Sequence, residues 1–199
     1  MVALTSGSVV GVLALQGDVR EHLAALAEAD AVARPIRRPD ELDGIDALVI
    51  PGGESTTMSK LLDTGALREP LAQLLSDGLP VFGTCAGMIL LACEVIDGRL
   101  DQQSFGAIDI AVRRNAYGRQ RDSFEARVAV DGVRGGPFPG VFIRAPRIEA
   151  AGDGVEVLAV HDNHPVLARQ GPVWVASFHP ELSGDFRLHE RFLTESEHP

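Results

Sequence analysis

The sequence predicts an α/β fold with a mainly parallel sheet and antiparallel additions. In the first half of the chain, short apolar runs such as residues 9–15 and 47–50 alternate with amphipathic segments, which is typical of strand–helix–strand units. In the second half, runs such as residues 124–130 and 155–160 alternate apolar with polar side chains, as half-exposed or antiparallel strands do. No internal repeat or low-complexity linker occurs, so we expect one domain over residues 1–199.

The elements of the first half follow from its apolar runs and turn residues. Residues 9–15 predict a strand buried on both faces, and Asp18 is placed to cap the helix that follows. Strands are expected at 9–15, at 47–50 and at a run ending with 81–82, and helices at 19–29, 54–62, 66–76 and 86–95.

The second half is expected to consist mainly of strands and to close with one helix. The run Val173-Trp174-Val175-Ala176-Ser177-Phe178 is its strongest strand pattern, because it is apolar throughout and rich in β-branched and aromatic residues. The expected strands are at 108–112, 124–130, 155–160 and 173–178, and the helix is at 184–193.

The net charge and the cysteine count narrow the class of protein. The chain has 18 Lys and Arg against 28 Asp and Glu, a net charge of −10, which argues against nucleic acid as its main partner. Two cysteines, Cys85 and Cys93, favour a reducing cytoplasm over a secreted disulfide scaffold. The first apolar run, residues 9–15, is too short to cross a bilayer, so neither a signal peptide nor a membrane span is expected.

A cysteine lies between two glycines where a strand is expected to turn into a helix, at Gly83-Thr84-Cys85-Ala86-Gly87. One interpretation is a tight turn that holds a buried cysteine. The other is a nucleophile elbow, in which the turn presents the thiol and the helix N-terminus favours the thiolate. The N–H of Ala86 would then hold a developing oxyanion, and the glycines would avoid the clash of a Cβ in so tight a turn.

A cysteine nucleophile needs a base, and the base needs a group that orients it. His179 and Glu181 follow the strong strand at 173–178, and ligands bind where the strands of such a sheet end. Being two residues apart on extended chain, both side chains can point the same way. Glu181 would hold the imidazole of His179 while His179 accepts the thiol proton. The alternative is a histidine at a strand end beside a solvated glutamate.

The other histidines are interpreted as structural. His161 and His164 lie in a polar turn, and since no cysteine or carboxylate cluster completes a site there, no metal is expected. His189 and His198 are expected on the surface. His22 lies on the first helix, where a capping or packing role is expected.

A glycine pair follows the strand at 47–50, in Pro51-Gly52-Gly53-Glu54-Ser55-Thr56-Thr57. The string is not a phosphate-binding Walker loop, because no Gly-Lys-Ser or Gly-Lys-Thr follows. Backbone N–H groups at Gly52 and Gly53 could supply a second oxyanion donor, and the helix start favours an anionic group. The alternative is a plain turn in which Ser55 or Thr56 caps the helix.

Arginines gather in one loop of this acidic chain, four of them within residues 113–121. A solvated loop would explain the run. The other two interpretations are a guanidinium that clamps a substrate carboxylate and a patch that docks a partner. Arg144 follows another strand and could also reach the site.

These strings together resemble the class I glutamine amidotransferases and, more narrowly, the glutaminase subunits of pyridoxal 5'-phosphate synthase. Cys85 in an elbow and the later His-Pro-Glu mark the class, and the strings spread over nearly the whole chain. They are GVLALQGDVREH, PGGESTTM, GTCAGMILLA, RNAYGRQRDSFE, FIRAP and SFHPEL. The resemblance implies a three-layer, flavodoxin-like fold.

The resemblance also implies an activity and a set of roles. Members of this family hydrolyse L-glutamine and pass the ammonia to a separate β/α-barrel synthase subunit, without a cofactor or metal of their own, and they become active on docking. Cys85 would be the nucleophile, and His179 and Glu181 would complete the triad. Glutamine would bind at Gly53, Glu54, Ser55, Arg114, Ile143 and Arg144, with oxyanion donors at Gly52, Gly53 and Ala86. Cys93 has no counterpart role and is expected to be buried on the helix behind Cys85.

Two other functions stay open from the sequence. One is an amidotransferase subunit that serves a different synthase, against which the RNAYGRQRDSFE string argues. The other is a non-catalytic protein on the same fold that uses its cysteine for redox sensing, against which His179-Pro180-Glu181 argues, because a sensor needs no triad.

Overall fold

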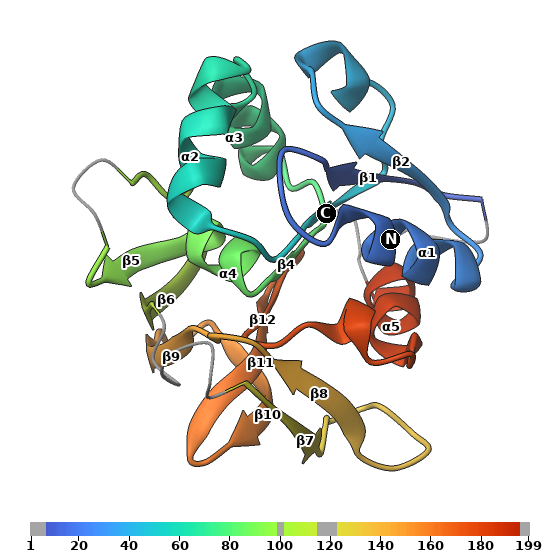
Figure 1. The fold of residues 1–199 in the computed structure, drawn as a ribbon, viewed down its shortest axis with the longest axis vertical. Helices are drawn as coiled ribbons and strands as arrows, with labels where there is room; N and C mark the ends of the chain where they lie inside the picture. The colour runs from blue at the N-terminus through green and yellow to red at the C-terminus, as the bar shows by residue number, and fades with distance from the viewer. Residues whose placement is uncertain (1–6, 99–101, 115–122, 196–199) are drawn as a thin grey trace.

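The structure is a computed structural model that describes residues 7–98, 102–114 and 123–195. Most of the arginine-rich string, from residue 115 on, and His198 lie outside the described residues. A seven-stranded sheet forms the centre of the molecule (Figure 1). Its strands are β1 (Val9–Leu13), β2 (Val32–Ile36), β3 (Ala47–Ile50), β4 (Val81–Thr84), β10 (Glu156–His161), β11 (His164–Gln170) and β12 (Val173–Ala176).

The central sheet has the strand order β10-β11-β12-β4-β3-β1-β2. The five strands from β12 to β2 run parallel to one another, and β11 and β10 extend the sheet antiparallel at one edge. The parallel part has the flavodoxin-like order, with the first strand beside both the second and the third. The expected mainly parallel sheet with antiparallel additions is confirmed.

Helices and two smaller sheets cover the central sheet (Figure 1). The helices are α1 (Val19–Glu28), α2 (Ser55–Thr64), α3 (Arg68–Ser76), α4 (Ala86–Leu91) and α5 (Arg187–Glu195), with 3₁₀ turns η1 (Pro39–Leu42) and η3 (Pro180–Leu182). One small sheet contains β5 (Ala92–Ile96), β6 (Ile108–Arg113) and β9 (Arg147–Ala151), and the other pairs β7 (Phe124–Val128) with β8 (Phe138–Phe142).

Successive side chains of the central strands pack into two hydrophobic cores, because neighbours on a strand point to opposite faces. In β12, Val173 and Val175 join the core under α2, α3 and α4, while Trp174 and Ala176 join the core under α1 and α5. The fold therefore has three layers, as the family resemblance implied. No helix in the described part of the chain is long and apolar enough to cross a membrane.

Two expectations for the segment after Cys85 are wrong. The helix expected at 86–95 ends at Leu91, and residues 92–96 instead form β5, which pairs in parallel with β6. Pairing with β6 overrides the local helical pattern. As a result Cys93 is exposed on β5 rather than buried on a helix.

Besides β5, the strands β2, β9 and β11 were not predicted from the sequence. Pro35 lies within β2, and Pro165 within β11, and a proline in an apolar run argues against a strand. β2 is an edge strand of the large sheet, which tolerates the missing N–H donor. In β11, His164 and Pro165 belong to the end that turns back to β10, a segment that the sequence suggested was a turn.

Candidate active site

The segments that follow four parallel strands meet at one edge of the central sheet, where ligands bind in such folds. These segments come after β1, β3, β4 and β12, and they surround a cavity of about 310 Å³. That volume is at the small end of the range for ligand pockets, as suits an amino acid. The cavity is lined by Gln16, Gly17, Asp18, Gly53, Glu54, Ser55, Cys85, Ile89, Arg114, Ile143, Arg144, Pro146 and His179.

Cys85 sits at the sharp turn between β4 and α4. Its φ of 49° is unusual for a residue with a side chain, and strained turns of this kind present nucleophiles. A Cβ added to Gly83 would lie 2.6 Å from Leu91 Cδ1, and one added to Gly87 would lie 2.0 Å from the Ile50 carbonyl oxygen. The prediction that both glycines are required by close approach is confirmed.

The histidine and glutamate that follow β12 lie beside the cysteine. The His179 Nδ1–H donates to Glu181 Oε1 at 2.8 Å, and the Cys85 side chain lies close enough to the His179 ring to favour its protonated form. Both His179 and Glu181 are buried, and Glu181 lies behind the imidazole, away from the cavity. The structure thus brings together the three side chains that the sequence predicted would meet.

The charges around His179 favour its protonated form. Burial lowers its pKa, but hydrogen bonds with Asp18, Cys85 and Glu181 outweigh burial and raise the pKa of His179 to about 12. Burial raises the pKa of the Glu181 carboxyl, against the lowering effect of the hydrogen bond from His179. An imidazolium beside the sulfur is the partner that a reactive thiolate needs.

Asp18 has a second role that the sequence did not suggest. It is the N-cap residue of α1, as predicted, although its side chain makes no capping hydrogen bond. Its Oδ2 lies instead 3.1 Å from His179 Nδ1, which faces the carboxylates of both Asp18 and Glu181. One ligand atom from each of these three residues lies within 4.8 Å of the others, a grouping that could geometrically hold a metal ion.

Two glycines let the loops after β1 and β3 pack against each other and against the imidazole. A Cβ on Gly17 would lie 1.7 Å from the Gly52 carbonyl oxygen, and one on Gly52 would lie 2.3 Å from His179 Cε1. The Gln16 side chain ties the same loops together, because its Oε1 accepts the Glu54 N–H at 2.7 Å. Gly52 is therefore in contact with the predicted base, next to Gly53 on the cavity wall.

Glu54 and Arg114 form a charged pair on the cavity wall. Arg114 donates to Glu54 Oε1 at 3.2 Å and to Gln102 Oε1 at 2.9 Å. Glu54, rather than Ser55 or Thr56, caps α2: its carboxylate accepts the N–H groups of Thr56 and Thr57. The alternative in which Ser55 or Thr56 caps the helix is wrong, because Glu54 occupies the N-cap position and its side chain reaches forward to the first turn.

Removing the Glu54 carboxylate is expected to weaken both the helix and the substrate site. We expect Glu54→Ala to lower the free energy of unfolding by about 1 kcal/mol through loss of the cap. We also expect a roughly tenfold higher KM for the substrate, because Arg114 loses the acceptor that holds it. Urea unfolding and steady-state kinetics measure the two effects, with Glu28→Ala on the exposed face of α1 as the control.

The stability loss in Glu54→Ala is expected to depend on pH. Burial raises the pKa of Glu54, but hydrogen bonds from Thr57 and Thr56 outweigh it and lower the pKa to about 2 from 4.5. A lowered folded-state pKa stabilises the fold above about pH 4.5, and this contribution is lost as the pH falls toward 2. The difference between wild type and variant should therefore shrink over that range, and a constant difference would contradict the capping role.

The remaining predicted residues also lie at the site. Ser55 begins α2, and Ile143 and Arg144 come from the loop after β8, where Arg144 has a φ of 44°. The Cys85 Sγ lies 4.0 Å from the Ile143 carbonyl oxygen. Ala86 begins α4 and is buried directly after the cysteine.

Sequence reasoning missed several wall residues and misplaced one histidine. Gln16, Ile89 and Pro146 line the cavity without having been predicted. Gln16 follows β1 at the same sheet edge as the other site segments, so the strand-end rule could have found it. His189 was expected on the surface but is fully buried on α5, next to His22.

Comparisons with known proteins give a consistent result. The model of the SNO glutamine amidotransferase family matches residues 12–198. A curated relative from Streptomyces coelicolor, named pyridoxal 5'-phosphate synthase subunit PdxT, is 61% identical over 184 residues, covering 92% of this chain and 91% of that protein. A protein of the same name from Salinispora arenicola is 61% identical over 189 residues, covering 92% and 94%. A crystal structure described as a glutamine amidotransferase has 49% identity and a TM-score of 0.87, covering 94% of this chain and 97% of that one.

Proposed function

The chain belongs to the SNO glutamine amidotransferase family, and on that premise we propose that it hydrolyses L-glutamine to L-glutamate and ammonia. The ammonia is supplied to a β/α-barrel synthase subunit that makes pyridoxal 5'-phosphate, in the cytoplasm and without nucleic acid or a membrane as partner. The observation that supports this most is the contact of Cys85, His179 and Glu181 beside a cavity of amino-acid size.

The proposed reaction begins with the Cys85 thiolate attacking the side-chain amide carbon of glutamine. The amide oxygen becomes an oxyanion, which the N–H of Ala86 and one from Gly52 or Gly53 hold. The His179 imidazolium then donates its proton to the amide nitrogen, the C–N bond breaks, and ammonia leaves. The product at this stage is a glutamyl thioester on Cys85.

Water completes the proposed cycle. His179, now neutral, accepts a proton from a water molecule that attacks the thioester carbon. The C–S bond breaks, glutamate leaves, and Cys85 returns as the thiolate beside the imidazolium. Glu181 accepts a hydrogen bond from His179 Nδ1 and so keeps the other ring nitrogen directed at the sulfur throughout.

The amino-acid end of glutamine carries one positive and one negative group, and the cavity wall offers both partners. Arg114, with Arg144 on the same wall, is suited to bind the α-carboxylate. Glu54, 3.2 Å from Arg114, is suited to attract the α-ammonium. Gly53, Ser55 and Ile143 form the neutral part of the proposed glutamine site.

A glutaminase assay with and without the barrel subunit tests this function. We expect the subunit to raise ammonia release from glutamine by on the order of 100-fold, the effect of completing one oxyanion donor. A barrel protein of another enzyme family serves as the control and should leave the rate unchanged. If the pyridoxal phosphate synthase subunit also leaves it unchanged, the proposed partner is wrong.

A further inference from the structure

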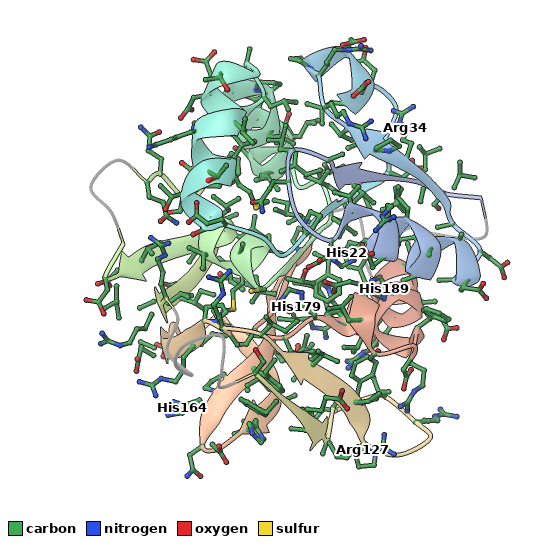
Figure 2. The ribbon with its side chains drawn as sticks, viewed as in Figure 1. His22, Arg34, Arg127, His164, His179 and His189 are labelled. Atoms are coloured by element: carbon green, nitrogen blue, oxygen red, sulfur yellow. The ribbon has the colours of Figure 1, made fainter. Side chains whose placement is uncertain are left out.

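Two buried histidines lie behind the triad, and the reaction proposed above uses neither. His22 comes from α1 and His189 from α5, and the side chains of both are fully buried. Figure 2 shows them side by side, close to His179, although they are 167 residues apart in sequence. Burying two titratable rings against each other costs free energy unless their polar atoms find partners.

A chain of polar contacts joins these histidines to the triad. His22 Nε2 lies 3.3 Å from Glu181 Oε2 and 3.1 Å from Thr84 Oγ1. On its other side, His22 Nδ1 lies 3.1 Å from His189 Nε2. Oε2 makes no regular hydrogen bond with any described residue, and the His22 Nε2 lies 3.3 Å from it, within ion-pair range. Glu181 therefore contacts an imidazole through each of its oxygens.

Both buried histidines are neutral. Burial and the neighbouring rings of His189 and His179 hold the pKa of His22 well below its usual value, and burial lowers the pKa of His189 to about 4. A neutral imidazole carries one N–H, and the other nitrogen is an acceptor. Which nitrogen carries the proton decides whether His22 presents a donor or a lone pair to Glu181.

The last group in this row of contacts, His189, determines the tautomers of both histidines. His189 Nδ1 is buried and has no hydrogen-bond partner among the described residues. A buried N–H without an acceptor is rare, so this nitrogen is the unprotonated one and His189 carries its proton on Nε2. That N–H donates to His22 Nδ1, and the proton of His22 is consequently on Nε2, facing Thr84 and Glu181.

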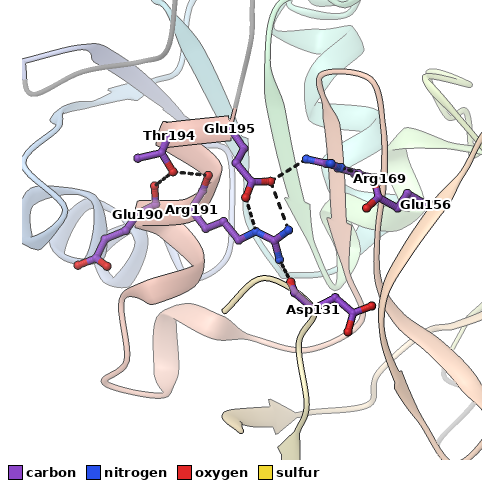
Figure 3. Close-up of polar contacts among 7 residues, drawn as sticks. All are labelled: Asp131, Glu156, Arg169, Glu190, Arg191, Thr194 and Glu195. Atoms are coloured by element: carbon purple, nitrogen blue, oxygen red, sulfur yellow. Dashed lines mark hydrogen bonds and ion pairs between the residues drawn. The ribbon is translucent and has the colours of Figure 1, made fainter. Parts of the chain in front are cut away.

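The helix that supplies His189 is firmly held. Arg191 donates to Glu195 at 2.8 Å within α5, and Arg169 of β11 donates to the other oxygen of Glu195 at 2.7 Å (Figure 3). Arg191 also donates to the Asp131 carbonyl oxygen. These contacts tie α5 to the sheet and so keep His189 in reach of His22.

We propose that His22, held in its Nε2–H tautomer by His189, is a positioning residue that donates to Glu181 Oε2 and so keeps Oε1 aligned on His179. A buried carboxylate is stable as an anion when donors reach both of its oxygens. The proposal rests on the proposed glutaminase function for its kinetic test, but the assignment of tautomers does not depend on that function.

The proposal has a consequence for the pH dependence of the reaction. The titratable groups around Glu181 are His179 from the strand end, Asp18 from the loop before α1, and His22 from α1, with Cys85 and His189 one contact further away. Without the His22 donor the anion of Glu181 is less stable, so the pKa of Glu181 rises. Glu181 then becomes protonated at a higher pH, and the acid limb of the kcat/KM profile moves to higher pH.

Substitutions of His22 test the proposal kinetically, in the presence of the barrel subunit. We expect His22→Leu to lower kcat about tenfold and to move the acid limb up by about one pH unit, with KM unchanged. His22→Gln places an amide N–H near the position of Nε2. This variant should restore most of the kcat and most of the wild-type position of the acid limb. Leu26→Val, buried on the same helix, is the control for a general loss of packing and should lower the rate equally at every pH, if at all.

Two outcomes would overturn the positioning role. One is a folded His22→Leu variant with a kcat within twofold of wild type. The other is a lowered kcat with an unmoved acid limb, as a purely structural role would give. If His22→Leu does not fold, His189→Leu gives the second test, because it removes the donor that holds the His22 tautomer and should lower kcat more than His189→Gln, which keeps an N–H there.

Nitrogen NMR of the wild-type chain labelled at its histidines tests the tautomers directly. We expect His22 and His189 each to show a protonated Nε2 and an unprotonated Nδ1 over the neutral pH range. A protonated Nδ1 on His22 would contradict the proposal whatever the kinetics. If wild type releases no ammonia from glutamine while the tautomers are as expected, the proposed function fails and the assignment of tautomers stands.

Discussion

Cys85→Ala is expected to abolish ammonia release from glutamine. In the proposed reaction the sulfur forms the bond to the amide carbon, so this substitution removes the attacking group. The loss of a nucleophile from a triad lowers kcat by on the order of 10⁴- to 10⁶-fold. Ammonia and glutamate should be measured together, in the presence of the barrel subunit, so that each product reports on the same step.

Cys93→Ala is the matched control for this substitution. Cys93 is the second cysteine of the chain and is exposed on β5, outside the cavity lining. The Cys93→Ala variant should retain the wild-type rate. Both variants should keep the far-ultraviolet circular dichroism spectrum of the folded protein. Glutamine hydrolysis at a comparable rate by Cys85→Ala would show that the chemistry does not proceed through a thioester.

Gly52→Ala is expected to cause the second-largest loss, although Gly52 contributes no side chain. The added Cβ would lie 2.3 Å from His179 Cε1 and 2.9 Å from Nδ1, so the imidazole or the loop has to move. A displacement of about 1 Å in a catalytic group costs on the order of 100-fold in rate. We expect kcat to fall by about this factor, because the ring no longer meets both Cys85 and Glu181.

Gly154→Ala is a suitable control for the change from glycine to alanine. Gly154 lies in an exposed turn before β10, and the closest atom to a Cβ there would be the side-chain Nε2 of Gln170, at 3.1 Å. This variant should keep the wild-type kcat and KM. If Gly52→Ala also keeps the wild-type kcat, the loop tolerates a shift and His179 is not held against it.

Much of the fold and of the site could be predicted from local pattern. The apolar runs at β1, β3 and β12 are buried on both faces. A continuous apolar run of this length predicts a buried strand without information about its neighbours. The two glycines around Cys85 indicate that other parts of the chain pack closely against this turn. His179 and Glu181 lie two residues apart at the end of a strand. Since parallel strands bring their carboxyl ends to one edge, these segments had to meet there.

Other features depended on contacts that the local pattern does not show. Residues 92–96 have a helical pattern but pair with β6. Pro35 and Pro165 argued against two strands, β2 and β11, whose pairing tolerates a proline. No local pattern distinguishes His189, on the buried side of α5, from a histidine on the surface. Its ring is buried because α5 packs beside α1, a contact between the two ends of the chain.

The sequence by itself determined the parallel sheet, the elbow at Cys85 and the three residues proposed as the triad, because glycine sterics, strand burial and a two-residue spacing act over short distances. Only the tertiary structure decided that Asp18 faces His179, that Glu54 holds Arg114, and that the His22 and His189 rings lie behind Glu181. Each of these is a contact of about 3 Å between separate segments, and such contacts follow from packing rather than from spacing along the chain.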